Sequence, residues 1–251
     1  MIANSSKAFS IFLTPIALMT SHLRNLSVHF LRCQPLPSMV EALVLIAVLG
    51  VGVHAHQTAS FPVGGTPVGL AFDGANIWVA NSADNTVTKM RANDGAILGT
   101  FSVGATPRRI TYDGTNIWVS NWNGNSVTKL RASDGALLLT LAMPQHPAGM
   151  TFDGANMWIA NYDNGTVTKV RASDNSILGV FAAGNTPLAL AFDGTNVWAA
   201  NNQGVGSATK VRASDGVMIG SYPTQGFPGD IVFDGANIWV ANFGGNTVIK
   251  Q

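Results

Sequence analysis

The stretch FDGANIWVAN, residues 72–81, decides the fold because near copies of it return four more times along the chain. The copies begin at Tyr112, Phe152, Phe192 and Phe233. A proline stands ahead of each copy, and successive prolines are separated by 40, 40, 40 and 41 residues. These phase markers are Pro67, Pro107, Pro147, Pro187 and Pro228. A period of this length is typical of an array in which each unit is one supersecondary element.

Each unit reads as four short antiparallel strands. In the second unit we expect them within RRITYDG (108–114), NIWVSN (116–121), SVTKLRASDG (126–135) and LLLTLAM (137–143), where the side-chain pattern has a period of two. Asp-Gly pairs punctuate the first and third connections, and glycine readily adopts the positive φ of tight hairpin turns. Four strands in 40 residues describe one blade of a β-propeller.

The two ends of the repeat region match each other. The last unit stops after its third strand, whereas TASFPVGGTP (58–67) matches the fourth-strand segment LGTFSVGATP (98–107). We therefore predict an all-β, five-bladed β-propeller of four-stranded antiparallel blades, closed by an N-terminal strand that completes the last blade. Such closure would remove an open sheet edge. A six- or seven-bladed ring formed by association and a fragment of a larger propeller stay open as alternatives.

The unit NIWVANSADNTVTKMRANDGAILGTFSVGATP (Asn76 to Pro107) resembles the YVTN-type β-propeller repeat. WVAN stands where that repeat has its Tyr-Val-Thr-Asn core, and NTV and VGATP also correspond. The resemblance covers residues 58–251 and extends more distantly to NHL-type and streptogramin-lyase-like propellers. Those families include surface-layer and periplasmic proteins, binding modules and a few enzymes. The resemblance therefore implies architecture far more than activity.

The first 56 residues differ from the repeats. The apolar run ALVLIAVLGVGV (42–53) is 12 residues long, which is shorter than a bilayer span and suits the core of a signal peptide cleaved after Ala55. We predict that residues 1–56 are a signal peptide or membrane-proximal leader and that residues 57–251 are the propeller. The predicted location is extracytoplasmic: secreted, periplasmic or at the cell surface. An uncleaved membrane anchor and a leader without function stay open.

Composition excludes several function classes. The chain of 251 residues has a net charge of +1, and only 11% of its residues are charged, so we expect no nucleic-acid partner. The single cysteine, Cys33, precedes the repeats, which contain one histidine and no glutamate. The streptogramin-lyase resemblance would imply a His/Glu/His metal constellation, which these residues cannot supply. We predict no metal, no cofactor and no catalytic residue, with a His146–Asp163 acid-base pair as the remaining enzymatic alternative.

Residues repeated in every unit have structural interpretations. The five equivalent tryptophans (Trp78, Trp118, Trp158, Trp198 and Trp239) are expected to pack blade against blade. The aspartates of the FDG turns are expected to bond their own backbone. The Lys-x-Arg pairs of the third strands, such as Lys89 and Arg91, are interpreted as a solubilising ladder on an outer strand.

The units differ from one another at one end, which we call the variable face. It carries the loops between the second and third strands (SADN, WNGN, YDNG, NQGVG and FGGN) and the loops that enter the next unit (GGTP, GATP, PQHP, GNTP and QGFP). A constant scaffold with one diversified end favours a binding surface, with neutral drift of tolerant loops as the alternative. The candidate ligand-binding residues are Arg108, Arg109, Trp122, Gln145, His146, Tyr162, Asp163, Asn202, Gln203, Gln225, Phe227, Asp230 and Phe243.

These residue types indicate the kind of ligand. Aromatic rings beside amides suit sugars or flat polar ligands, and Arg108 and Arg109 suit a carboxylate or phosphate. An ion pair of these arginines with Asp230 across the channel mouth is the alternative. We predict an exported module that binds a small polar ligand, a glycan or a protein partner, with membrane contact only through an uncleaved N-terminal segment. The alternatives are a structural surface or envelope repeat protein without a small ligand and, third, a lyase-like enzyme.

Overall fold

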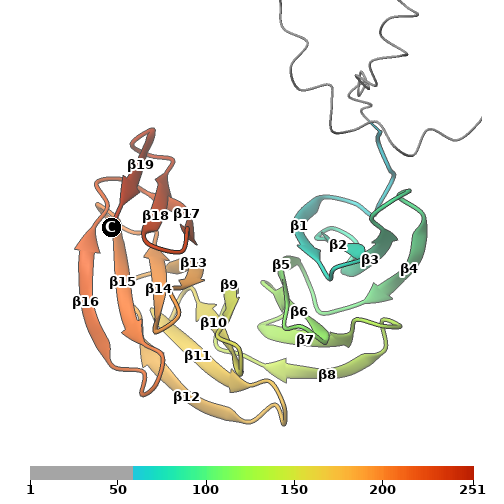
Figure 1. Cartoon of the computed structure of the whole chain (residues 1–251), viewed down its shortest axis with the longest axis horizontal. Coiled ribbons are helices and arrows are strands. Elements are labelled where there is room, and N and C mark those ends of the chain that lie inside the picture. Colours follow the sequence, from blue (N-terminus) through green and yellow to red (C-terminus); the bar gives the residue numbers. More distant parts are fainter. Residues whose placement is uncertain (1–58) are drawn as a thin grey trace, which may run out of the picture. The chain divides into compact units, whose positions relative to one another are not determined.

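The computed structural model describes residues 59–251, in which 19 strands form five antiparallel sheets (Figure 1). The first sheet contains β1 (Pro67–Phe72), β2 (Asn76–Asn81), β3 (Thr86–Arg91) and β4 (Ile97–Ser102). The second contains β5 (Pro107–Tyr112), β6 (Asn116–Asn121), β7 (Ser126–Arg131) and β8 (Leu137–Ala142). The third contains β9 (Pro147–Phe152), β10 (Asn156–Asn161), β11 (Thr166–Arg171) and β12 (Ile177–Ala182). The fourth contains β13 (Pro187–Phe192), β14 (Asn196–Asn201), β15 (Ser207–Arg212) and β16 (Met218–Pro223). The fifth contains β17 (Pro228–Phe233), β18 (Ile238–Asn242) and β19 (Thr247–Lys250).

The chain divides into two units, Met1–Ala59 and Ser60–Gln251, and the five sheets belong to the second. Each sheet is a simple meander in which consecutive strands pair, as the period-two pattern predicts. The described residues therefore confirm an all-β fold of five propeller-like blades. The leader predicted for residues 1–56 lies outside the described residues.

The aspartate of each FDG turn organises the hairpin that follows it. Asp73 Oδ1 accepts hydrogen bonds from the backbone N–H groups of Ala75 (2.9 Å) and Asn76 (2.7 Å), and Gly74 takes the required positive φ of 98°. These bonds confirm the turn-forming role. The indole N–H of Trp78 also donates to Asp73 Oδ2 at 2.8 Å, a contact that the sequence pattern alone does not predict.

Apolar clusters fill the junctions between neighbouring sheets. Four such clusters lie in the described chain, and each combines side chains from two consecutive sheets. At the first junction, Trp78 and Val87 pack with Ile110 and Ile117 of the next sheet. Trp78, Trp118 and Trp158 are fully buried, and Trp198 is 7% exposed. The predicted packing of blade against blade is confirmed for these four tryptophans, whereas the fifth, Trp239, is half-buried and belongs to none of the four clusters.

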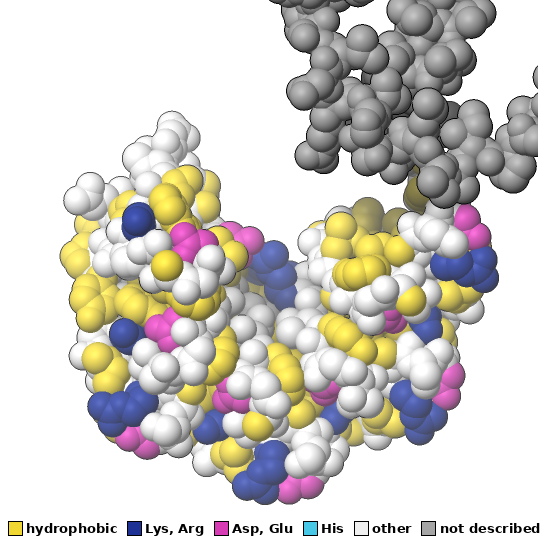
Figure 2. All heavy atoms as spheres, viewed as in Figure 1, with side chains coloured by type: hydrophobic (Ala, Val, Ile, Leu, Met, Phe, Trp, Pro, Cys, Tyr) yellow, Lys and Arg dark blue, Asp and Glu magenta, His cyan; other side chains and the backbone are white. Residues whose placement is uncertain are grey.

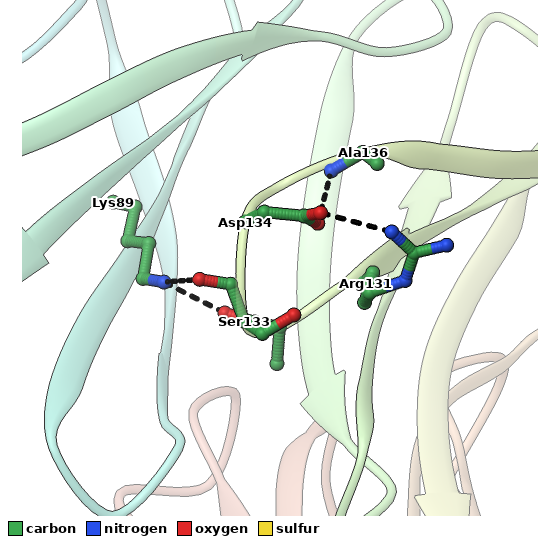
Figure 3. A network of polar contacts seen from close by, with 6 residues as sticks. Lys89, Arg131, Ser133, Asp134 and Ala136 are labelled. Atoms are coloured by element: carbon green, nitrogen blue, oxygen red, sulfur yellow. Dashed lines mark hydrogen bonds and ion pairs between the residues drawn. The ribbon is translucent and has the colours of Figure 1, made fainter.

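Three lysines of the third strands, in the first three sheets, each tie their own sheet to the next one, so their interpretation as an outer ladder is wrong. Lys89 is 6% exposed, and its Nζ donates to the backbone carbonyls of Ala132 (2.7 Å) and Ser133 (2.9 Å) in the second sheet (Figure 3). The same tie, at 2.6 Å, joins Lys129 to Ala172 O and Lys169 to Ala213 O. These hydrogen bonds direct the lysines to the neighbouring sheet. The arginines two residues later end their strands and are exposed beside the aspartates of their own turns.

The predicted closing strand is not formed. Among the described residues, β17–β18–β19 is a three-stranded sheet, and residues 59–63 belong to no strand. The ring of Phe61 instead lies against the turn at Gly95 of the first sheet, where a β-carbon would clash with it. Figure 2 shows the open side between the β1–β4 blade and the β17–β19 blade. The four apolar clusters of the described residues join consecutive blades, and none of them joins the first blade to the fifth.

Candidate ligand-binding site

Backbone hydrogen bonds join the two kinds of loop that make up the variable face. The N–H of Trp122 donates to Thr106 O at 2.9 Å, and the N–H of Tyr162 donates to His146 O at 3.1 Å. The fourth sheet repeats this contact between Asn202 and Thr186. The loop after the second strand of a blade therefore lies beside the loop that enters the same blade. The alternating up-and-down direction of the strands predicts this placement.

Four side chains from two neighbouring blades form one cluster on this face. The guanidinium carbon of Arg108 lies 4.2 Å from the ring centre of Trp122, within the range of a cation–π contact. The Trp122 ring stacks on His146 with centres 4.7 Å apart and interplanar angle 17°. It also packs against Tyr162, with centres 5.0 Å apart. Arg108 is thus held by an aromatic support that spans the second and third blades.

Asp163 completes this support by fixing the imidazole. His146 Nδ1 and Asp163 Oδ2 are 2.6 Å apart, and a hydrogen bond at that distance orients the ring that stacks on Trp122. The backbone of His146 has a φ of 53°, and its N–H donates to Asn125 Oδ1 at 3.0 Å. Non-glycine residues in this conformation need such support from their surroundings. The chain therefore holds His146 at both its backbone and its side chain.

The same backbone conformation occurs at every loop that enters a blade, with φ between 51° and 58°. It falls on the residue directly before the proline in four loops (Thr66, Thr106, His146 and Thr186), whereas in the fifth loop it falls on Gln225, three residues before Pro228. The conformation belongs to the repeat, whereas the imidazole is specific to the third blade. The cluster is therefore a local addition to a repeated loop.

A pocket opens beside Arg108. Its volume is about 410 Å³, and it is lined by Val68, Ser82, Thr106, Arg108, Arg109 and Trp122. Burial, and after it the positive charge of Arg109, lowers the pKa of Arg108 from its usual value, while Tyr162 raises it. Within the described residues neither Arg108 nor Arg109 forms an ion pair. Two neighbouring cations without a carboxylate partner favour the binding of an anion.

The central cavity brings Arg109 and Asp230 to the same space. This cavity, of about 390 Å³, is lined by the inner strands of the five blades, and both residues contribute to its wall. The alternative of an ion pair across the channel mouth is not realised among the described residues. Asp230 Oδ1 instead accepts from the backbone N–H of Ile231 at 3.0 Å.

Most of the remaining candidates belong to other parts of the variable face, whereas Gln145 directly precedes His146 of the arginine cluster. Phe227 and Phe243 stack on each other in the fifth blade with ring centres 5.9 Å apart, and both are exposed. Asn202 Nδ2 donates to Pro228 O at 3.0 Å, which ties the fourth blade to the fifth. Gln145, Gln203 and Gln225 lie in exposed loops. The thirteen candidates therefore do not form one continuous site.

Three residues that line the pocket were not predicted from the sequence. Val68, Ser82 and Thr106 occupy the positions that Arg108, Trp122 and His146 occupy one blade later. Their side chains have no chemistry that indicates ligand binding, so only their positions in the repeat could have identified them. A residue at a variable position contributes to the site when the next blade carries the functional group.

Residues 59–251 hold no group of three or more His, Cys, Asp or Glu side chains placed to bind a metal ion. The same part of the chain has no helix that is long and apolar enough to cross a membrane.

Comparisons with known proteins show the fold. No family model and no curated protein matches the chain. Hydrazine synthase of Kuenenia stuttgartiensis is similar in structure, with a TM-score of 0.64 and 16% identity over 74% of this chain and 58% of that one. A functionally unknown protein from Desulfotomaculum acetoxidans DSM 771 has the same TM-score and identity over 72% of this chain and 64% of that one. The chain thus spans less than two thirds of these neighbours, and at this identity they indicate a propeller-like fold alone.

Proposed function

We propose that this chain is a propeller module that binds a small polar anion in the pocket of Arg108 and Arg109. The observation that carries the proposal is the pair of arginines without an ion-pair partner in the described residues, beside a pocket of about 410 Å³. Guanidinium groups bind carboxylate and phosphate with paired hydrogen bonds. The fold is consistent with a binding module, and the cluster supplies the chemistry.

Trp122 acts in this proposal as a positioning residue. Arg108 and His146 both lie against its ring, which leaves little of that ring for stacking on a sugar. The sugar-binding role expected for this tryptophan is therefore replaced by support of the Arg108 guanidinium. A sugar would bind here through an acidic group that it carries.

Two finer assignments belong to the same proposal. The WVAN and VGATP motifs support membership among YVTN-type propellers. The apolar run at residues 42–53 supports export, so that the pocket would meet ligands outside the cytoplasm. Detection of the chain only in the cytoplasmic fraction of its cell would contradict export and would leave the anion site untouched.

The anion site is tested by isothermal titration calorimetry of the full chain with inorganic phosphate and with glucuronate. We expect one of these probes to bind, with an affinity that falls as salt concentration rises. Arg108→Ala should weaken binding at least about tenfold, since a charge-assisted hydrogen bond is worth about 1.5–3 kcal/mol. Arg171→Ala, which removes an exposed arginine paired with Asp174, is the matched control and should bind as the wild type does. Absence of binding at millimolar probe, or equal affinity of Arg108→Ala, would reject the proposal.

The structural repeat protein stands as the second candidate. It is favoured by a different observation, the apolar side chains exposed on the two blades that border the open side. That observation leads to the inference that follows.

A further inference from the structure

The fifth blade exposes a face that is buried in each of the preceding four. Val248 of β19 is 64% exposed, whereas the residues at its position in the earlier blades are at most 1% exposed. Those residues are Val87, Val127, Val167 and Ala208. Ala241 is likewise exposed and Trp239 half-buried, and both line an apolar hollow of about 310 Å³ with Val232 and Val248. We call this surface the outgoing face.

The first blade exposes the opposite half of the same kind of junction. Leu70 of β1 is 69% exposed, whereas its counterparts are 7–8% exposed. Those counterparts are Ile110, Met150, Leu190 and Ile231. Leu70 lines a hollow of about 450 Å³ with Phe61, Ile77 and Met90. We call this surface the incoming face; Figure 2 shows the opening that both faces border.

The two partners of the polar contact that joins neighbouring blades are also divided between these faces. At the first junction Lys89 lies over Trp78 and donates to Ala132 O. On the outgoing face Lys250 Nζ lies 5.7 Å from the ring centre of Trp239 and donates to no carbonyl within the described residues. Ala92, which holds the position of Ala132 in the first blade, is exposed on the incoming face. A donor and its matching acceptor thus lie on opposite sides of the opening.

The segment whose sequence matches the missing fourth strand of the fifth blade lies on the incoming face. Phe61 lies over Gly95 as Phe101 lies over Gly135 at the first junction. Phe101 belongs to β4, where it pairs with Val87 of β3. By the same register, residues 60–63 would pair with β19 and place Phe61 opposite Val248. The incoming face therefore presents the edge that β19 needs.

We propose that these faces bind each other between two copies of this chain, the outgoing face of one packing on the incoming face of the next. Within one copy the faces are held apart by four close-packed junctions, and closing the opening would require those junctions to repack. A second copy can supply the missing contacts with every junction unchanged. The contact is heterologous, so two copies joined by one such contact keep one outgoing face and one incoming face for further contacts.

A heterologous contact allows a mixing test. Leu70→Asp blocks the incoming face, and Val248→Asp blocks the outgoing face; both residues are exposed, so neither change removes a buried side chain. Sedimentation velocity of the full chain should show the wild type as assemblies and each variant alone as a monomer. An equimolar mixture of the variants retains one good face of each kind and should form a dimer of twice the monomer mass. Leu137→Asp, on the outer strand β8 and 60% exposed, is the matched control and should assemble as the wild type does.

Three results of this test would contradict the proposed contact. A monomeric wild type would overturn the proposal and would indicate closure within one copy or faces without a partner. Assembly that persists in both single variants would place the contact on another surface, such as residues 1–58. A mixture that stays monomeric would show that the two faces do not recognise each other. Circular dichroism of each variant confirms that its sheets are intact.

Discussion

The aspartate of the FDG turn is where local and long-range structure meet. Asp153 shapes its own turn through the backbone N–H groups of Ala155 and Asn156. Its second oxygen accepts the indole N–H of Trp158, which is buried between two blades. A turn residue therefore also fixes the side chain that packs one blade on the next. This double use explains why aspartate stands in all five copies.

We expect Asp153→Ala to lower the free energy of unfolding by about 1–2 kcal/mol, since a hydrogen bond to a charged group is worth about 1.5–3 kcal/mol and this carboxylate is partly solvated. Chemical denaturation followed by tryptophan fluorescence measures the change. Asp174→Ala, at an exposed turn beside Arg171, should cost less.

The same contact has a pH signature. Burial raises the pKa of Asp153, but the hydrogen bonds from Trp158, Asn156 and Ala155 outweigh burial and lower it below its ordinary value. A lowered pKa in the folded state stabilises the protein above the unfolded value of about 3.9, and this stabilisation is lost as pH falls through the folded pKa. The wild type should lose stability below about pH 4, and Asp153→Ala should lose less. Parallel pH profiles for the two proteins would contradict this account.

At the scale of the element, the contacts at the junctions between blades stabilise the fold. Each junction combines a buried tryptophan, aliphatic side chains and, at three places in the described chain, a lysine that donates to a carbonyl of the next sheet. Burial lowers the pKa of Lys129, with the charge of Asp113 acting against it. The cation thus depends on its contacts in the next sheet rather than on water.

Lys129→Ala should lower the free energy of unfolding by about 2–3 kcal/mol, because it removes two hydrogen bonds and leaves the partly buried Ala172 O without this donor. Thermal and denaturant unfolding of the full chain measure the loss. Lys210→Ala is the matched control, since Lys210 lies over Trp198 in the same way but donates to no carbonyl in the described residues. Equal losses for the two variants would show that the carbonyl contact adds nothing.

The sequence predicted strands and turns well because both depend on local chemistry. Period-two alternation and Asp-Gly pairs located the hairpins of every blade. Alternation also shows which side of a strand Lys89 occupies, but it cannot show whether water or another sheet covers that side. The ladder interpretation failed for this reason, since the partner of Lys89 lies 43 residues further along the chain.

At the scale of the whole molecule, the sequence predicted the face that carries the site but not the closure of the propeller. Placing loops at one end of each blade needed only strand alternation, so the sequence put Arg108, Trp122 and His146 on one face. Their stacking depends on how the second and third blades are spaced, which only the packed junction determines. Closure failed as a prediction because matching ends are a local property, whereas the angle between blades is the sum of four junctions.

The open side leaves the fifth blade less supported than the third, since it packs against one neighbour while the third packs against two. Backbone opening is easiest where few apolar contacts resist it. In the monomeric Leu70→Asp variant, amide hydrogen exchange should therefore be faster in β18 and β19 than in β10 and β11. In the wild type, raising the protein concentration should slow exchange in β18 and β19 and leave β10 and β11 unchanged, because assembly covers the outgoing face of the fifth blade and no part of the third blade. Equal protection of the two pairs of strands in the monomer would show that the fifth blade is held by contacts other than those at its single junction.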